Sequence, residues 1–213
     1  MTGLDGIAIT DHDAIGASLR AAELAPAYGL VALPGVEVST ADGHLLALGV
    51  EQRPVPYRPL AETVARVRTL GGVPVVPHPF QLSRHSVGRR NVADLEDSVG
   101  MEVYNAWSLL DVRNRRARQF ATERGYPLLG GSDAHVPAVV GRAYTEVVVE
   151  IDAASTNAVD RETFLDAILV GETRSRGVRM PMRRYVRKYA ESVRRKTNSA
   201  LGALVGSRRG RRA

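Results

Sequence analysis

The stretch Gly6-Ile7-Ala8-Ile9-Thr10-Asp11-His12-Asp13 joins an apolar run to an abrupt polar end. A β-branched apolar run that is hydrophobic on both faces predicts a buried parallel strand. Polar residues at the carboxyl end of such a strand are the usual position of chemistry in α/β folds. The stretch therefore predicts a functional site at the carboxyl edge of a parallel sheet.

The same pattern recurs three times further along the chain. Glu37 follows an apolar run, His78 follows Val73-Pro74-Val75-Val76, and the stretch 131–135 (Gly-Ser-Asp-Ala-His) follows Leu128-Leu129. Asp42-Gly43 predicts a hairpin, after which His44 opens a further strand. Because predicted strands and helices alternate, we expect an α/β fold, either a parallel barrel or a doubly wound sheet.

The coarse assignment of elements follows from apolar periodicity and from glycine and proline stops. Strands are expected at 6–9, 30–33, 45–50, 73–76, 101–104, 128–129 and 145–151, helices at 14–27, 60–70, 110–124 and 161–170, and a polar loop at 81–91. We expect one main domain over residues 1–175 and a basic helical tail over 176–213.

Composition and charge exclude several classes of function. The 213 residues include no cysteine, so disulfides and thiolate metal sites are excluded. No basic segment leads into an apolar one at the N-terminus and no long apolar run occurs, so we expect a cytoplasmic protein without signal peptide or transmembrane segment. Residues 1–170 hold 15 Arg against 21 acidic residues, so the basic balance of the chain does not indicate nucleic-acid binding by its main domain.

The basic charge is concentrated at the C-terminus. Residues 171–213 hold 12 Arg and 2 Lys against 2 Glu. Tyr185, Val186, Tyr189 and Val193 recur at helical spacing, which predicts an amphipathic basic helix. It is either a solvated helix that lies on the acidic main domain or an arm that recruits nucleic acid or an anionic membrane surface.

Metal-capable side chains gather at the predicted strand ends: Asp11, His12, Glu37, His44, His78, Asp133 and His135. Imidazole and carboxylate without thiolate suit Zn, Mn or Fe. A pair of such ions clamps the attacking and leaving oxygens of a displacement at phosphorus, so phosphoester hydrolysis is the reaction that this set serves best. Two residues remain open: Asp11 is a ligand or a cap of the following helix, and His85 is a ligand or an ordinary polar-loop residue.

Together the motifs around Asp11-His12-Asp13, Glu37, His44, Pro77-His78-Pro79-Phe80, Glu102-Val103-Tyr104-Asn105 and Asp133-Ala134-His135 closely resemble the polymerase-and-histidinol-phosphatase (PHP) superfamily. The resemblance extends over residues 3–145. It implies a distorted seven-stranded β/α barrel with up to three divalent metal ions, Mn or Zn or else Fe. It also implies hydrolysis of a phosphomonoester or phosphodiester by metal-activated water. Among relatives, stand-alone phosphatases and exonucleases that act on a nucleotide or an oligonucleotide end are most similar.

The resemblance also implies roles for single residues. Glu37 would bridge two metals and share one of them with His44 and His78, Asp133 would bind the other, and His12 and His135 would hold a third. We expect Asp11, His12 and Arg84 to be catalytic and Asn105 to contact the substrate. Arg84, Arg89 and Arg90, in the loop after His78, are expected substrate contacts on physical grounds alone, because guanidinium groups are suited to phosphate.

One motif of the PHP pattern has no counterpart in this sequence. The first motif, a His-x-His pair on the first strand, would precede Leu4. We therefore expect a barrel that lacks its first strand and helix. In one interpretation the natural start lies upstream and the protein is a complete enzyme. In the alternative, this is a catalytically impaired metal-binding domain whose basic tail mediates nucleic-acid or membrane interaction.

Overall fold

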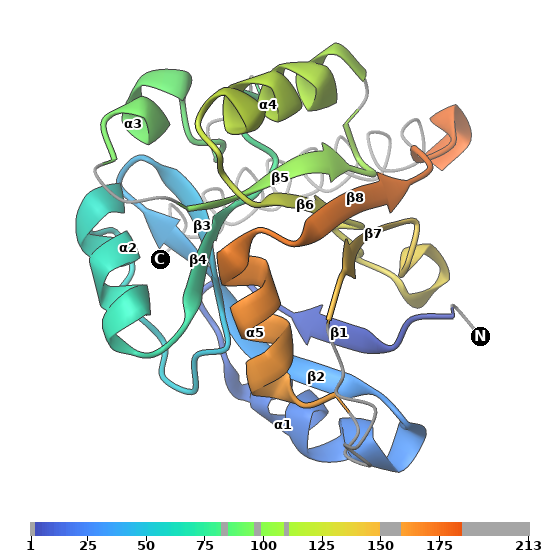
Figure 1. Cartoon of the computed structure of the whole chain (residues 1–213). Coiled ribbons are helices and arrows are strands. Elements are labelled where there is room, and N and C mark those ends of the chain that lie inside the picture. The colour runs from blue at the N-terminus through green and yellow to red at the C-terminus, as the bar shows by residue number, and fades with distance from the viewer. Residues whose placement is uncertain (1–2, 82–84, 96–98, 109–110, 150–158, 185–213) are drawn as a thin grey trace, which may run out of the picture. The chain divides into compact units, whose positions relative to one another are not determined.

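A computed structural model describes residues 3–81, 85–95, 99–108, 111–149 and 159–184 (Figure 1). Arg84 and the predicted amphipathic helix around Tyr185 lie outside these described residues. The chain divides into two compact units, Met1–Arg179 and Met180–Ala213. In the described part of the chain no helix combines the length and the apolar character that a membrane crossing requires.

The first unit is built on a six-stranded sheet whose strands lie side by side in chain order and curl into a half-barrel (Figure 1). The strands are β1 (Gly6–Ile9), β2 (Val31–Thr40), β3 (Gly43–Leu48), β4 (Val73–Val76), β5 (Gly100–Asn105) and β6 (Leu128–Gly131). β3 runs antiparallel to both of its neighbours and the other pairs are parallel. Thr40 pairs with Gly43 across a tight turn, which confirms the hairpin predicted at Asp42-Gly43.

Helices cover both faces of this sheet. They are α1 (Gly16–Leu24), α2 (Leu60–Thr69), α3 (Arg89–Ala93), α4 (Asp111–Glu123) and α5 (Arg161–Val170), with short 3-10 helices at Ala25–Tyr28 and Pro137–Val139. Successive strand residues point to opposite faces, so Leu45 and Ala47 enter a core with α2, α3 and α4, while Leu46 and Leu48 face α5. Burial on both faces explains why these strands are apolar without alternation.

Two further strands form a separate two-stranded antiparallel sheet, β7 (Ala143–Val147) with β8 (Thr173–Gly177). Thr145 Oγ1 donates to the carbonyl of Gly130 and accepts from its N–H, and Thr173 Oγ1 accepts from Leu128 N. Side-chain hydroxyls therefore join this strand pair to the edge of β6 without a strand ladder. The described strands thus form a half-barrel and a separate antiparallel pair, and the closed seven-stranded barrel stays a prediction.

Two assignments from the sequence were wrong. Residues 81–91 were expected to be loop, yet helix α3 begins at Arg89 after Gly88. β8 was not foreseen because its sequence, Thr-Arg-Ser-Arg-Gly, carries no apolar residue. Its inward positions are the hydroxyl residues Thr173 and Ser175, which are buried by their contacts with β6 and α4 rather than by apolar packing.

Candidate metal centre

His12 lies beside Glu37 because the chain continues the path of β1 past its last residue. His12 and Glu37 form an isolated parallel bridge, in which Asp13 N donates to the Glu37 carbonyl at 2.9 Å and Glu37 N donates to the Asp11 carbonyl at 3.2 Å. The side chain of Asp13 fastens the same turn by accepting from Ser39 N at 2.8 Å. The polar end of the first strand is therefore held against the middle of β2.

His44 reaches Glu37 through the register of the hairpin. Leu46 pairs directly with Glu37 and Ser39 pairs with His44, so Glu37 and His44 are diagonal neighbours on one face of the sheet. His78 arrives from β4, which pairs with β3 and ends two residues before it. The segments at β1, β3 and β4 therefore direct three imidazoles toward the carboxylate that β2 carries.

The distances define a compact centre around Glu37. Its Oε1 lies 2.7 Å from His44 Nδ1 and 3.3 Å from His78 Nε2, and its Oε2 lies 3.5 Å from His12 Nδ1. Candidate ligand atoms of His12, Glu37 and His44 all lie within 4.8 Å of one another. The side chains of Glu37, His44 and His78 are largely buried, whereas that of His12 is 56% exposed. The centre is therefore open to solvent on the His12 side.

The pKa values show how strongly these groups are coupled without a metal. Burial raises the pKa of Glu37, but its contacts with His44 and His78 and the charges of His78 and His12 outweigh burial and lower this pKa to about 2. Burial lowers the pKa of His78, but its hydrogen bond to Glu37 and the charges of Glu102, Glu37 and Asp133 raise it to about 9. In the metal-free protein an ionised Glu37 thus faces a protonated His78.

One buried atom tests whether these residues fit a metal ion. His44 Nδ1 contacts Glu37 Oε1 but has no hydrogen-bond partner of acceptable geometry among the described residues. A buried ring nitrogen without a partner is costly unless another group satisfies it. Neutral imidazole and carboxylate oxygens are also the donors that Zn and Mn accept. The residues present therefore fit a divalent cation.

Comparisons with known proteins bear on the fold of the chain. A family model described as PHP-associated matches residues 112–173. The computed structure is similar, with a TM-score of 0.65 and 18% identity, to a two-domain protein from Bacteroides vulgatus that contains a predicted PHP-like metal-dependent phosphoesterase, over 83% of this chain and 57% of that one. The chain has the PHP fold.

Two further proteins are similar to this chain, one in structure and one in sequence. A candidate metal-dependent phosphoesterase from Bifidobacterium adolescentis shares the PHP fold with a TM-score of 0.53 and 18% identity, over 79% of this chain and 87% of that one. The uncharacterized protein MJ1587 of Methanocaldococcus jannaschii is 32% identical over 106 residues, which are 49% of this chain and 60% of the relative. The chain thus spans about three fifths of that relative's length.

The other predicted ligands of the PHP pattern lie in a second cluster after β6. Asp133 has a left-handed backbone with φ 47°, and its Oδ1 lies 3.5 Å from His135 Nδ1. The carbonyl of Asp133 also lies 2.9 Å from the same ring nitrogen. Asp133 raises the pKa of His78 through its charge, but no direct contact joins it to Glu37 among the described residues. The structure therefore brings Asp133 and His135 together and leaves them beside the Glu37 centre.

The sequence left the roles of Asp11 and His85 open, and the structure gives these two residues different surroundings. Asp11 does not cap the following helix, because α1 has Ile15 at its N-cap and no side-chain cap, so that interpretation was wrong. Asp11 is exposed beside His12, and only its main chain contacts Glu37 in the described structure. His85 stacks on His44, with ring centroids 4.9 Å apart, and its carbonyl accepts from His44 N. His85 therefore borders the centre.

The predicted substrate-binding residues are dispersed. Arg84 lies outside the described residues, Arg90 is exposed on α3, and the guanidinium of Arg89 lies 5.2 Å over the ring of Phe120. Asn105 is 1% exposed; its Nδ2 donates to Glu102 Oε2 and its Oδ1 accepts from Trp107 N. Asn105 is thus bonded inside the protein, and its contact with a substrate stays a prediction.

Glu102 is a site residue to which the sequence reading assigned no role. It lies within β5, is 6% exposed, and burial raises the pKa of its carboxyl to about 7 against the opposing charge of His78. The available signal was its position between Met101 and Val103, where an apolar side chain is expected.

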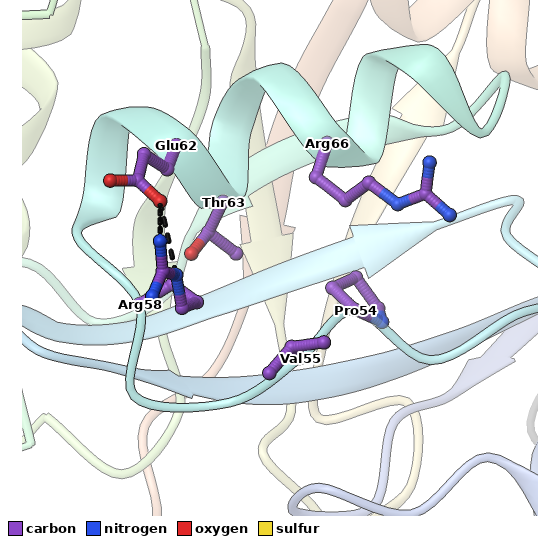
Figure 2. A pocket seen from close by; sticks show the side chains of 6 residues that line it. All are labelled: Pro54, Val55, Arg58, Glu62, Thr63 and Arg66. Carbon is purple, nitrogen blue, oxygen red and sulfur yellow. Dashed lines mark hydrogen bonds and ion pairs between the residues drawn. The ribbon is translucent and has the colours of Figure 1, made fainter.

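A surface pocket is lined by none of these ligands. Figure 2 shows its lining by the loop before α2 and the first turns of that helix, with Arg58 paired to Glu62 across the opening at 2.7 Å. The lining residues are Pro54, Val55, Arg58, Glu62, Thr63 and Arg66. None is a histidine, and its single carboxylate is already paired, so this pocket does not offer a metal site.

Proposed function

We propose that this chain is a metal-dependent phosphoesterase that hydrolyses a phosphomonoester or phosphodiester. The observation that carries the proposal is the convergence of His12, His44 and His78 on the buried carboxylate of Glu37. The PHP fold that the chain shares with proteins named as metal-dependent phosphoesterases supports the same reaction class. A nucleotide or an oligonucleotide end is the substrate we propose, because the centre is open on the side of His12.

The ligand set can be divided among up to three divalent ions. Glu37, His44 and His78 would hold one ion, Glu37 and Asp133 a second, and His12 with His135 a third. When bound, Mn or Zn, or else Fe, would neutralise phosphate charge and make a water molecule more acidic. We propose Asp11 as a residue that accepts or relays a proton at the open side, since it is exposed next to His12.

The protein's own contribution is to hold the ligands before an ion arrives. Each ligand strand is anchored by main-chain bonds, such as Glu37 N to the Asp11 carbonyl and His44 N to the His85 carbonyl. Ligands that are already oriented lose little conformational entropy on binding. Arg90 and Arg84 are the proposed phosphate contacts, as guanidinium groups match phosphate oxygens in a bidentate manner.

The direct test is reconstitution. The chain is stripped with a chelator and reloaded with Mn²⁺, Zn²⁺ or Fe²⁺. Bound metal is counted, and turnover is measured on p-nitrophenyl phosphate, bis(p-nitrophenyl) phosphate and end-labelled oligonucleotides. We expect metal-dependent hydrolysis that Glu37→Gln abolishes and that Glu62→Gln, an exposed carboxylate on α2, leaves intact. Bound metal without turnover on any of these substrates would contradict the proposal.

A second candidate function rests on the basic charge of residues 171–213. We propose as the alternative a metal-binding but catalytically impaired domain whose tail binds nucleic acid or an anionic membrane surface. Residues 171–213 hold 14 basic against 2 acidic residues, and this charge favours such partners. The reconstitution experiment separates the two candidates, because only the first requires turnover.

A further inference from the structure

Glu102 is an unusual residue for the interior of β5. It is buried between the core residues Met101 and Val103, where a carboxylate is costly unless hydrogen bonds compensate its lost hydration. Its Oε2 accepts from His78 N at 2.6 Å and from Asn105 Nδ2 at 2.9 Å. The bond to His78 is short for a main-chain N–H donating to a carboxyl oxygen.

The group that Glu102 holds is the main chain of a metal-ligand candidate. His78 has φ 33°, in the left-handed region that residues with a side chain rarely adopt. Its N–H is fixed by Glu102, and its carbonyl accepts from Ser86 Oγ at 2.8 Å. The strained turn is therefore held from both sides, and the imidazole that it carries is directed at Glu37.

The other oxygen of Glu102 lies against the end of β6. A Cβ added to Gly131 would collide with Glu102 Oε1, so a larger residue there would displace the carboxyl group. Asp133 follows two residues later. Asn105, which binds the carboxylate, is itself anchored to α4, because Asn105 N donates to Asn114 Oδ1. Glu102 thus fills the space between the strand ends that carry His78 and Asp133.

We propose that Glu102 is a positioning residue, which fixes the main chain of His78 and the separation of the β4 and β6 ends so that His78 and Asp133 are oriented for metal. This inference rests on the proposed metal-dependent function. It predicts that the hydrogen-bond acceptor at position 102 matters more than the negative charge, since an oxygen must receive His78 N–H.

Two variants separate the acceptor from the charge. Glu102→Gln keeps an oxygen of similar placement, and Glu102→Met keeps the volume but removes the acceptor. We expect Glu102→Met to weaken Co²⁺ or Mn²⁺ affinity by about 10–100-fold, as is typical when a partner that orients a ligand is lost. We expect Glu102→Gln to bind metal nearly as the unmodified chain does. Amide exchange of His78, followed by NMR in the metal-free protein, should accelerate in Glu102→Met and not in Glu102→Gln.

Gly131→Ala provides an independent route to the same defect, because its Cβ displaces the carboxylate while Glu102 itself is unchanged. Thr173→Val is the matched control: it removes a buried hydroxyl that accepts from Leu128 N, far along the chain from any proposed ligand. We expect this control to lower the Tm without changing metal affinity. A merely structural role of Glu102 would make its variants behave like Thr173→Val.

The outcomes distinguish this inference from the proposed function. Unchanged metal affinity and unchanged His78 exchange in Glu102→Met would overturn the positioning role, whatever the activity. Metal binding by the unmodified chain without phosphoester turnover would overturn the proposed function and leave the positioning role supported by affinity and exchange. Absence of metal binding by the unmodified chain would overturn both.

Discussion

Glu37 is the residue on which the candidate metal centre depends. It contacts the rings of His12, His44 and His78, although its own side chain is only 12% exposed. A buried carboxylate stays ionised only if cationic or hydrogen-bonding partners compensate its lost hydration. Imidazoles do so in the metal-free protein, and a divalent cation would do so when bound.

The first prediction concerns Glu37→Gln. An amide lacks the charge and one of the two acceptor oxygens, so the shared ligand is lost. We expect metal affinity, measured by competition with a chelator, to fall by more than the ~10–100-fold typical of changes outside the ligand set. Glu62→Gln, on the exposed face of α2, should bind metal as the unmodified chain does. Equal metal content in both variants would remove Glu37 from the centre.

The second prediction concerns the pH dependence of the metal-free protein. His78 has a folded pKa of about 9 against an ordinary 6.5, so its stabilising contribution is complete below pH 6.5 and is lost as the pH rises through 9. The pKa of Glu102 is also raised, from 4.5 to about 7. Its contribution to the free energy of unfolding is therefore likewise lost with rising pH, between pH 4.5 and 7. Glu37, at about 2 against 4.5, contributes above pH 4.5 and loses its contribution as the pH falls toward 2.

The Tm in the presence of a chelator should therefore be highest near pH 4.5 and fall steadily toward pH 9. Added Mn²⁺ or Zn²⁺ should reverse the trend at the alkaline end, because metal binding requires a deprotonated His78. His78→Gln should flatten the metal-free profile above pH 6.5. A metal-free Tm that rises between pH 6.5 and 9 would contradict the assignment of these groups.

At the scale of elements, the junction between β6 and the antiparallel pair β7–β8 depends on hydroxyl groups. Thr145 Oγ1 bonds both the N–H and the carbonyl of Gly130, and Thr173 Oγ1 accepts from Leu128 N. A Cβ at Gly130 would lie 2.5 Å from the Tyr144 carbonyl, so glycine permits the close approach of the two segments. The β7–β8 pair therefore covers the edge strand β6, which would otherwise expose unpaired main-chain N–H and carbonyl groups.

The third prediction follows from this junction. Thr145→Val keeps the shape but leaves the half-buried Gly130 N–H without its partner, and we expect a loss of about 1–3 kcal/mol in the free energy of unfolding. The measurement is urea denaturation with an unchanged m-value. Thr69→Val, whose hydroxyl is exposed on α2 and bonds only the Ala65 carbonyl, should change stability by less than about 0.5 kcal/mol. Equal effects of the two variants would show that the hydroxyl junction is unimportant.

At the scale of the whole molecule, charge separates the chain into two parts. The first 170 residues have an acidic balance and residues 171–213 a strongly basic one. The compact unit that holds the candidate centre ends at Arg179. The proposed nucleotide substrate is anionic, so a basic segment in the same chain would raise the local concentration of that substrate by long-range attraction.

The fourth prediction tests that attraction. Deleting residues 180–213 removes 11 basic side chains and one acidic side chain. We expect the full chain to bind a single-stranded oligonucleotide with an affinity that falls steeply with salt, and the truncated chain to lose most of that affinity. Hydrolysis of p-nitrophenyl phosphate should be unchanged, as this small substrate needs no arm. An unchanged, salt-insensitive oligonucleotide affinity after truncation would reject the arm hypothesis.

Several features could be predicted from the sequence because their causes are local. The apolar runs before His12 and His78 predicted strands near their observed positions, and the Asp42-Gly43 turn predicted the antiparallel β2–β3 pair. The strand expected at 30–33 continues to Thr40 because its pairing with β3 extends it, so Glu37 lies within β2 and not at a strand end as predicted. The helices at 60–70 and at 161–170 were also expected, since apolar periodicity and the stops at Gly71 and Gly171 are recorded in the chain itself.

Only the tertiary structure decided which polar residues meet. The contacts of Glu37 with three imidazoles depend on the parallel bridge to His12, the hairpin register of His44 and the pairing of β4 with β3. Two other contacts also join residues that are distant in the chain. Glu102 accepts a hydrogen bond from His78 N, and the hydroxyl of Thr173 in β8 accepts one from Leu128 N. Local sequence determines where strands form, whereas strand order and register determine the distances between the polar side chains that these strands carry, and the candidate metal centre is made of those distances.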